Sequence, residues 1–245
     1  MGDAKRIEVK PISRQDADRV IRALHYSGKV VNNSQVHFGV FLDGRCGGAL
    51  QFGPPIRKSA ALSTVAGTSW NEMLELSRMA LADWLPRNGE SRSLAYALRL
   101  LKQNYKHLQW VQTFADATQC GDGLIYRASG WSLLQVNKNT HMWQLPSGDV
   151  ECDLSFRPGA GQKTSQGAAS FLRSRGAVPL PGFQLRYIYF LDPTAQDRLT
   201  VPILPYSAIE AAGAGMYKGQ PTRGKSDTSD TPAIHAGEGG YASDA

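Results

Sequence analysis

Residues 123–131 (GLIYRASGW) constrain the fold of this chain more than any other stretch. The segment before them, 108–117, is apolar and aromatic with β-branched residues, which is typical of a buried strand, and Asp116 lies at its end. A buried strand, a short helix carrying Tyr126, and a turn made of Gly130 and Trp131 therefore follow one another. This order predicts an α/β domain with a carboxylate at a strand end and a phenol on the next helix.

The segments on both sides continue this alternation. Residues 73–81 are expected to form a strand, 86–90 a loop and 131–136 a further strand. Between them, Leu94, Ala97, Leu98 and Leu101 recur at helical spacing, so 91–105 is expected to be an amphipathic helix that begins at Ser91. Residues 73–136 are thus predicted to run strand, loop, helix, strand, helix, strand.

The two ends of this region carry further signals. Residues 6–12 alternate as a strand, and Ser13 is expected to cap a helix that runs to about Leu24. Residues 36–42 and 48–52 are expected to pair as a hairpin around Asp43 and Gly44. Residues 184–191 are predicted to be the last strand, and 202–206 to extend past it.

A length of 245 residues with 42% apolar content suits one domain, predicted over residues 1–206. Residues 158–181 are rich in Gly, Ser, Ala and Gln and are expected to be an insertion or lid, with a solvated loop as the alternative. Residues 207–245 form a tail that is expected to be largely disordered from about residue 219, because it lacks apolar side chains.

The order of elements resembles the GNAT N-acyltransferase fold, an α/β (α+β) class with a central mixed, mostly antiparallel sheet flanked by helices. In that fold a helix N-terminus holds the donor's pyrophosphate and a tyrosine on the next helix is the general acid. The resemblance implies that Arg87 and Ser91 bind the donor and that Tyr126 protonates the leaving group. The loop 87–91 (RNGES) departs from the usual pattern, since Glu90 would repel a pyrophosphate.

Five motifs narrow the resemblance because they occur together in one order. They are HYSG at 25–28, ELSR at 75–78, NGES at 88–91, FAD at 114–116 and IYRASGW at 125–131, with RYIYFLD at 186–192 after them. This set resembles the Mom DNA-modification family of Mu-like bacteriophages over roughly residues 5–206. The resemblance implies a transferase that adds a glycinamide-type (acetamido or carbamoylmethyl) group to the exocyclic amine of adenine in DNA and so blocks restriction. The functional positions that carry over are His25, Tyr26, Arg78, Ser91, Asp116 and Tyr126.

The resemblance leaves the donor open between acetyl-CoA and an aminoacyl-tRNA such as glycyl-tRNA, and the altered loop agrees with a donor other than ordinary acetyl-CoA. Iron is associated with the family, but His25, Asp116 and Cys120 do not have a recognisable ligand spacing. The oligomeric state is also open, with a homodimer as one option.

The chemistry of adenine gives two of these residues candidate roles. The adenine amine is a poor nucleophile because its lone pair is delocalised, so a carboxylate has to take its proton as the C–N bond forms. Asp116 is the candidate base, with helix capping as its structural alternative. Tyr126 is the candidate acid, with core packing as its alternative.

Three other residues are assigned to the acceptor and donor. His25 and Tyr26 place an imidazole beside a phenol where the first helix ends, a position that faces the acceptor in GNAT folds; simple helix termination is the alternative. Arg78 lies on a core strand and is costly to bury unless it is paired. It is expected to meet Glu72, Glu75 or Asp116, or to hold a phosphate or carbonyl of the donor.

The formal net charge of +6 and the pI of about 9.3 favour a polyanionic partner, here double-stranded DNA. Base pairing in the duplex hides the reactive edge of adenine, so the base has to be extruded from the helix into a pocket. Tyr26 or Trp131 is expected to stack on the extruded base. Phosphate contacts are expected from five cations, which are Lys29, Arg57, Lys58, Arg173 and Arg175.

Two other functions fit the same sequence. One is an acyl-CoA-dependent N-acyltransferase acting on a small amine or a protein, and the other is a non-catalytic DNA-binding phage protein. No hydrophobic run approaches membrane-spanning length and the N-terminus lacks the apolar core of a signal peptide, so a cytoplasmic protein with no membrane partner is expected.

Overall fold

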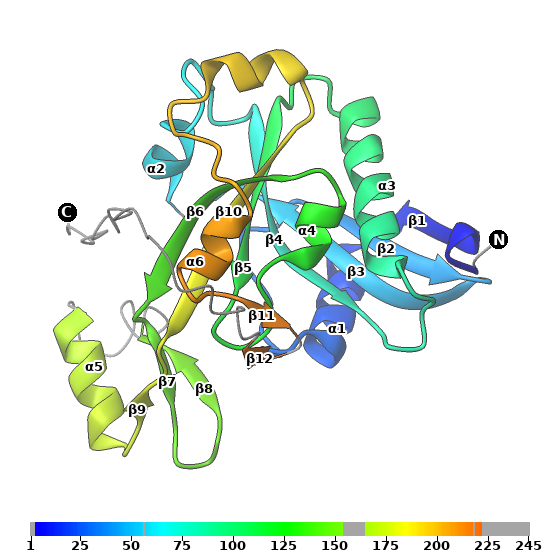
Figure 1. The fold of residues 1–245 in the computed structure, drawn as a ribbon. Helices are drawn as coiled ribbons and strands as arrows, with labels where there is room; N and C mark the ends of the chain where they lie inside the picture. The colour runs from blue at the N-terminus through cyan, green and yellow to red at the C-terminus, as the bar shows by residue number, and fades with distance from the viewer. Residues whose placement is uncertain (1–2, 56, 154–164, 218, 222–245) are drawn as a thin grey trace. The chain divides into compact units, whose positions relative to one another are not determined.

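The computed structural model describes residues 3–55, 57–153, 165–217 and 219–221, and the chain divides into two compact units (Figure 1). Unit 1 consists of Met1–Phe114, Gly123–Leu134 and Arg186–Pro205. Unit 2 consists of Ala115–Asp122, Gln135–Leu185 and Tyr206–Ala245.

A seven-stranded sheet has the order β1-β2-β3-β4-β5-β10-β6. Its strands are β1 (Ile7–Pro11), β2 (Val36–Leu42), β3 (Arg45–Gly53), β4 (Met73–Leu81), β5 (Trp110–Asp116), β6 (Ser132–Asn139) and β10 (Gly182–Phe190). The pairs β1–β2, β2–β3 and β3–β4 are antiparallel, whereas β4–β5 is parallel. The mixed, mostly antiparallel sheet expected for a GNAT-like fold is confirmed.

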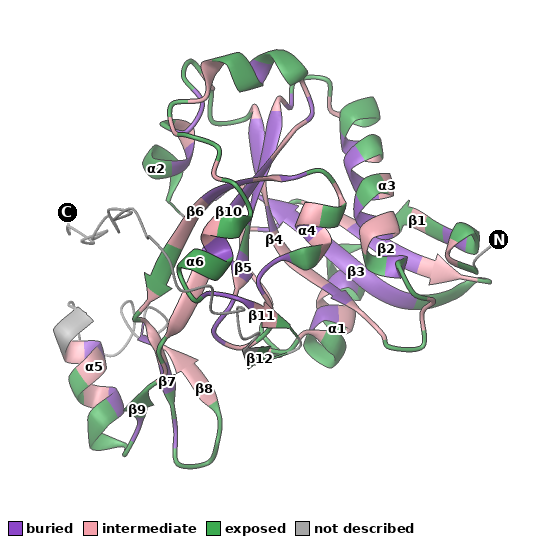
Figure 2. Cartoon of the chain, viewed as in Figure 1, coloured by how far each residue is buried: buried purple, intermediate pink, exposed green. Residues whose placement is uncertain are grey.

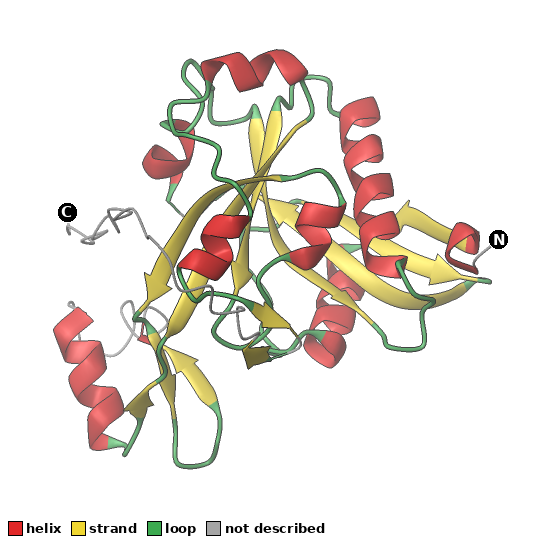
Figure 3. Ribbon diagram, in the orientation of Figure 1, coloured by secondary structure: helices red, strands yellow, loops and turns green. Residues whose placement is uncertain are grey.

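Helices α1 (Arg14–Leu24) and α3 (Gly89–Asn104) of unit 1 cover opposite faces of the sheet (Figure 3). Ala17 and Ile21 of α1 pack against Ala80 of β4. A Cβ added at Gly89, the first residue of α3, would lie 3.9 Å from a side-chain methyl of Leu81. Successive residues of a strand point to opposite faces of a sheet. Because α1 packs against Ala80 and α3 begins beside Leu81, the two helices lie on opposite faces of the sheet.

The other helical elements of unit 1 are η1 (Asp3–Arg6), α2 (Lys58–Leu62), α4 (Leu124–Ala128) and η3 (Pro193–Arg198). Beside α2, Val65, Met73, Trp110 and Ile188 form a buried cluster. Strands β3 and β5 are largely buried and β4 is buried in part, as the purple and pink segments show (Figure 2).

Unit 2 contains a three-stranded sheet in the order β8-β7-β9. Its elements are β7 (Met142–Gln144), β8 (Val150–Cys152), α5 (Ser165–Ser174), β9 (Val178–Pro179), α6 (Ser207–Ala211), β11 (Met216–Tyr217) and β12 (Gln220–Pro221). Trp143, Leu145, Leu172 and Ala177 form its buried cluster. Parts of the predicted insertion (158–164) and tail (222–245) lie outside the described residues, and the predicted domain boundaries stay a prediction.

Candidate functional site

The candidate site of unit 1 begins where the parallel pairing of β4 and β5 ends. The register of this pair runs from Met73–Trp110 to Leu76–Thr113, while β4 continues to Leu81. At the same point the β3–β4 register shifts, because Gln51 pairs with Arg78 and Phe52 with Leu76. Ser77 is therefore the extra residue of a β-bulge, a feature that re-aims neighbouring side chains.

Arg78 follows this bulge, and its guanidinium donates hydrogen bonds to two backbone carbonyls. Its Nε lies 2.9 Å from the oxygen of Lys29 and its Nη1 lies 2.7 Å from that of Ser77. Burial lowers the pKa of Arg78, while the nearby Tyr26 and Glu75 act in the opposite direction. Hydrogen bonds to a carboxylate were one expectation, but the bonds that Arg78 makes go to carbonyls and tie β4 to the loop after α1.

His25 is the C-cap residue of α1, and its ring lies against that of Tyr26, with centroids 4.3 Å apart. Burial, reinforced by the charge of Arg78, lowers the pKa of His25 from 6.5 to about 4, so the imidazole is neutral at pH 7. The backbone N–H of Ser27 donates to Nδ1, which assigns the proton of the neutral ring to Nε2. Tyr26 is 51% exposed, which leaves its ring accessible for stacking.

The partly buried His25 predicts an acid-sensitive contribution to stability. Between pH 6.5 and about 4 the unfolded state binds more protons at this residue than the folded state, so stability falls as pH falls through this window. We expect wild-type protein to lose about 2 kcal/mol more than His25→Gln between pH 7 and pH 5 in urea unfolding. His107→Gln, which removes an exposed imidazole, is the control. Equal pH dependence in wild type and His25→Gln would contradict the assignment.

Tyr126 on α4 is 9% exposed and packs between two aromatic rings, with its centroid 5.5 Å from that of Trp131 and 5.4 Å from that of Tyr187. Its hydroxyl lies 3.4 Å from Oγ1 of Thr113, the last residue of β5 in the β4–β5 ladder. Gly123 opens α4 at φ +83°, and a Cβ there would lie 2.5 Å from the Tyr187 ring. The geometry therefore places the Tyr126 hydroxyl at the end of the β4–β5 pair.

Asp116 belongs to unit 2, where its carboxylate organises the turn after β5. One oxygen accepts the backbone N–H of Thr118 at 2.9 Å and the other accepts the side-chain amide of Gln119 at 3.0 Å. These bonds hold the turn and do not cap α4, whose N-cap residue is Gly123, so the helix-capping alternative for Asp116 is wrong. Because each oxygen can accept more than one hydrogen bond, a role as base is compatible with them, and that role stays a prediction.

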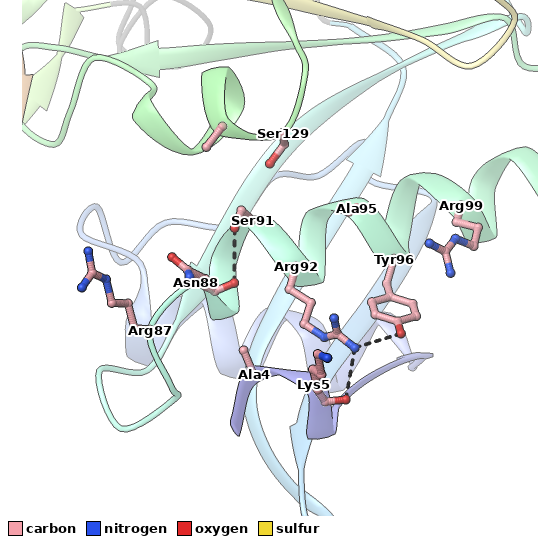
Figure 4. Close-up of a pocket in the computed structure, with 11 residues that line it drawn as sticks. Ala4, Lys5, Arg87, Asn88, Ser91, Arg92, Ala95, Tyr96, Arg99 and Ser129 are labelled. Atoms are coloured by element: carbon pink, nitrogen blue, oxygen red, sulfur yellow. Dashed lines mark hydrogen bonds between the residues drawn. The ribbon is translucent and has the colours of Figure 1, made fainter. Parts of the chain in front are cut away.

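The predicted donor loop lies at the N-terminus of α3, which begins at Gly89 and not at Ser91 as the sequence predicted. Asn88 is the N-cap residue in a left-handed conformation (φ 67°) and makes no side-chain cap. The loop and helix border a cavity of about 450 Å³, to which Arg87, Ser91 and Ser129 contribute (Figure 4). Glu90 is exposed, lies in the first turn of α3 and is not among the residues that line this cavity.

A buried polar network across β4, β5 and β10 was missed by the sequence analysis. Nε2 of Gln112 donates to Glu75 at 2.7 Å, and Nη2 of Arg186 donates to Oε1 of Gln112 at 2.6 Å and to Thr64 at 2.6 Å. Burial raises the pKa of Glu75 and lowers that of Arg186. The signal for this network was a lone arginine within the apolar strand predicted at 184–191.

The five predicted phosphate contacts are divided between the units. Lys29, Arg57 and Lys58 are exposed in unit 1, and the Lys58 ammonium lies 5.6 Å from the centroid of the 60% exposed Trp70. In unit 2, Arg173 and Arg175 are exposed and lie over the rings of Trp143 and Phe171. Each unit thus presents cations next to aromatic rings, and their contacts with DNA stay a prediction.

Among the residues that the structure describes, no three His, Cys, Asp or Glu side chains are grouped so that they could hold a metal ion. Within the same residues, no helix combines the length and the apolar character needed to cross a bilayer.

The mixed sheet, with its antiparallel β1–β4 part and its parallel β4–β5 pair, agrees with the fold expected from the sequence, and comparison with known proteins specifies the family. Residues 6–208 match the Mom protein family, and the chain belongs to this family. A relative, "Methylcarbamoylase mom" of Escherichia phage Mu, is 33% identical over 202 residues, which are 82% of this chain and 82% of the relative.

Solved structures of acetyltransferases are more distant. An IAA acetyltransferase from Bacillus cereus is 10% identical, with a TM-score of 0.43 over 75% of this chain and 99% of its own. Spermidine/spermine N-acetyltransferase SpeG from Vibrio cholerae is 9% identical, with a TM-score of 0.43 over 79% of this chain and 98% of its own.

Proposed function

We propose that this chain transfers a glycinamide-type (acetamido or carbamoylmethyl) group to the exocyclic amine of adenine in double-stranded DNA. Membership of the Mom family over residues 6–208 carries this proposal, supported by 33% identity to a phage protein named a methylcarbamoylase. The modified base would protect DNA from restriction, and the host cytoplasm is the proposed place of action.

Each candidate residue is proposed for one step of such a transfer. The exposed Tyr26 stacks the extruded base, and the neutral His25 offers an N–H donor at Nε2 for an acceptor atom of the purine. Asp116 takes the proton that the amine loses as the new C–N bond forms, and Tyr126 returns a proton to the leaving group. Arg78, Arg87 and Ser91 are proposed to bind the donor, with acetyl-CoA and an aminoacyl-tRNA such as glycyl-tRNA as the two candidates. Acetyl-CoA lacks the nitrogen of the glycinamide-type group, so by itself it could supply only an acetyl group. Attack of the amine on the ester carbonyl of glycyl-tRNA would break the ester bond, release the tRNA hydroxyl and give the glycyl isomer, so a carbamoylmethyl product requires a subsequent isomerisation.

Analysis of nucleosides from DNA of cells that express the chain tests this proposal. A carbamoylmethyl, a methylcarbamoyl and a glycyl group contain the same atoms, so all three give one mass. Fragmentation of the modified deoxyadenosine distinguishes an N–CH2 linkage from an amide or urea linkage and thereby identifies the group. A transferred acetyl group would differ in mass and would favour acetyl-CoA as donor. An unmodified deoxyadenosine pool in cells that contain folded protein would refute the proposal.

Binding of duplex DNA should depend strongly on salt if Lys29, Arg57, Lys58, Arg173 and Arg175 neutralise phosphates. The slope of log affinity against log salt is expected to be about −0.9 per contacted phosphate. Arg57→Gln/Lys58→Gln should therefore flatten the slope by about 1.8, measured by fluorescence anisotropy.

The matched control for this measurement is Lys102→Gln/Lys106→Gln, which removes the same charge from the C-terminal end of α3 and the residues after it. A slope that is the same in wild type and in Arg57→Gln/Lys58→Gln would mean that these two side chains do not contact DNA.

A further inference from the structure

The cavity beside α3 is lined by cations that no carboxylate neutralises. Lys5 comes from η1, Arg87 from the loop before α3, and Arg92 and Arg99 from α3 itself. None of the residues that line the cavity is acidic, and within the described part of the chain no ion pair involves any of the four. Such uncompensated positive charge favours an anionic ligand.

The cations extend along the helix. Arg92 and Arg99 are seven residues apart, which is about 10 Å at 1.5 Å per residue. Arg92 reaches toward the N-terminal segment, where its Nη2 donates to the backbone oxygen of Lys5 at 3.1 Å (Figure 4). A row of this length matches successive phosphates of a chain better than the two adjoining phosphates of a single diphosphate.

An aromatic ring lies among these cations. The guanidinium carbons of Arg92 and Arg99 are each 5.0 Å from the centroid of Tyr96, and Arg92 also donates to the Tyr96 hydroxyl at 3.1 Å. Cationic grooves interleaved with aromatic rings are typical of surfaces that bind single-stranded nucleic acid. A cavity of about 450 Å³ falls in the range of sites for small molecules, so it suits one nucleotide of a strand and not the width of a duplex.

We propose that the surface formed by Lys5, Arg92, Tyr96 and Arg99 binds a single strand of nucleic acid through its phosphodiester backbone. The Nε of Arg92 is buried and has no hydrogen-bond partner among the described residues, so the protein leaves part of this guanidinium unsatisfied. The first turn of α3 has N–H groups without partners within the helix, which favour a phosphate, and also the carboxylate of Glu90, which opposes one. This inference does not depend on the proposed modification of adenine.

The test compares Lys5→Gln/Arg99→Gln with Lys102→Gln/Lys106→Gln, which removes the same charge outside the cavity. Lys5 and Arg99 are exposed, so their replacement is expected to preserve the fold. Binding of an end-labelled single-stranded oligonucleotide is measured by fluorescence anisotropy over a range of salt. The double variant in the cavity should flatten the salt slope by about 1.4 and lower affinity about tenfold near 0.15 M salt. The control should bind as wild type does.

The measurement is made with an oligoribonucleotide and with an oligodeoxyribonucleotide of the same sequence. The one that binds more tightly identifies the strand as RNA or DNA. Coenzyme A is added as a competitor. The inference is overturned if Lys5→Gln/Arg99→Gln binds both oligonucleotides as tightly as wild type does, or if the control variant loses as much affinity for them. It is also overturned if Lys5→Gln/Arg99→Gln loses affinity for coenzyme A alone. Loss of strand binding in the cavity variant, combined with unmodified DNA from cells making wild-type protein, would refute the proposed function and leave this inference standing.

Discussion

Tyr126→Phe is expected to lower modification of DNA about 100-fold or more while leaving the fold intact. The substitution keeps the ring, which packs against Trp131 and Tyr187, and removes only the hydroxyl that lies 3.4 Å from Oγ1 of Thr113. The variant therefore lacks the hydroxyl that is proposed to protonate the leaving group, whereas the ring contacts that stabilise α4 remain. The yield of modified deoxyadenosine at equal levels of soluble protein measures the effect.

Tyr189→Phe is the matched control for this substitution. Tyr189 belongs to the same aromatic cluster, with its ring centroid 5.6 Å from that of Trp131, and it loses the same hydroxyl group. It should modify DNA at close to the wild-type rate. If Tyr126→Phe did so as well, Tyr126 would be a packing residue, and the acid would have to be sought near Arg78 and Ser91.

Asp116→Asn is expected to cause a loss of similar size, about 100-fold or more, because the amide cannot accept the proton of the adenine amine. Its remaining side-chain oxygen can still accept the N–H of Thr118, so the turn after β5 should persist. Duplex DNA affinity should stay near that of the wild type. Asp122→Asn, a change of the same kind in a residue that is 93% buried within the same segment, is the control. Wild-type activity in Asp116→Asn would make this residue a turn cap only.

Much of the fold followed from local signals in the sequence. Ser13 accepts the N–H of Asp16 at the start of α1, as its capping pattern predicts. Asp43 and Gly44 both have positive φ, 51° and 78°, as a tight hairpin turn requires. The strand predicted at 73–81 is β4 with the same bounds. These features depend on neighbouring residues alone.

Other features depended on distant residues and were missed. The helix predicted from Ser91 begins two residues earlier, at Gly89, which is within the usual error of a helix boundary. Strands β7, β8 and β9 have three, three and two residues, too few to show periodicity.

Partners of buried side chains were equally hidden. The carbonyl of Lys29, which accepts from Arg78, lies 49 residues away, and Gln112 and Arg186, which bond to each other, are 74 residues apart in sequence. The sequence predicted that Arg78 needs partners, whereas only the fold identifies them.

The most direct test of the account is the nucleoside composition of DNA from cells that make the wild-type chain, Tyr126→Phe or Asp116→Asn at equal soluble levels. The account predicts a modified deoxyadenosine with an N–CH2 linkage in the wild-type sample, and about 100-fold less or none in each variant. Deoxyadenosine without modification in the wild-type sample, or equal modification in all three samples, would contradict it.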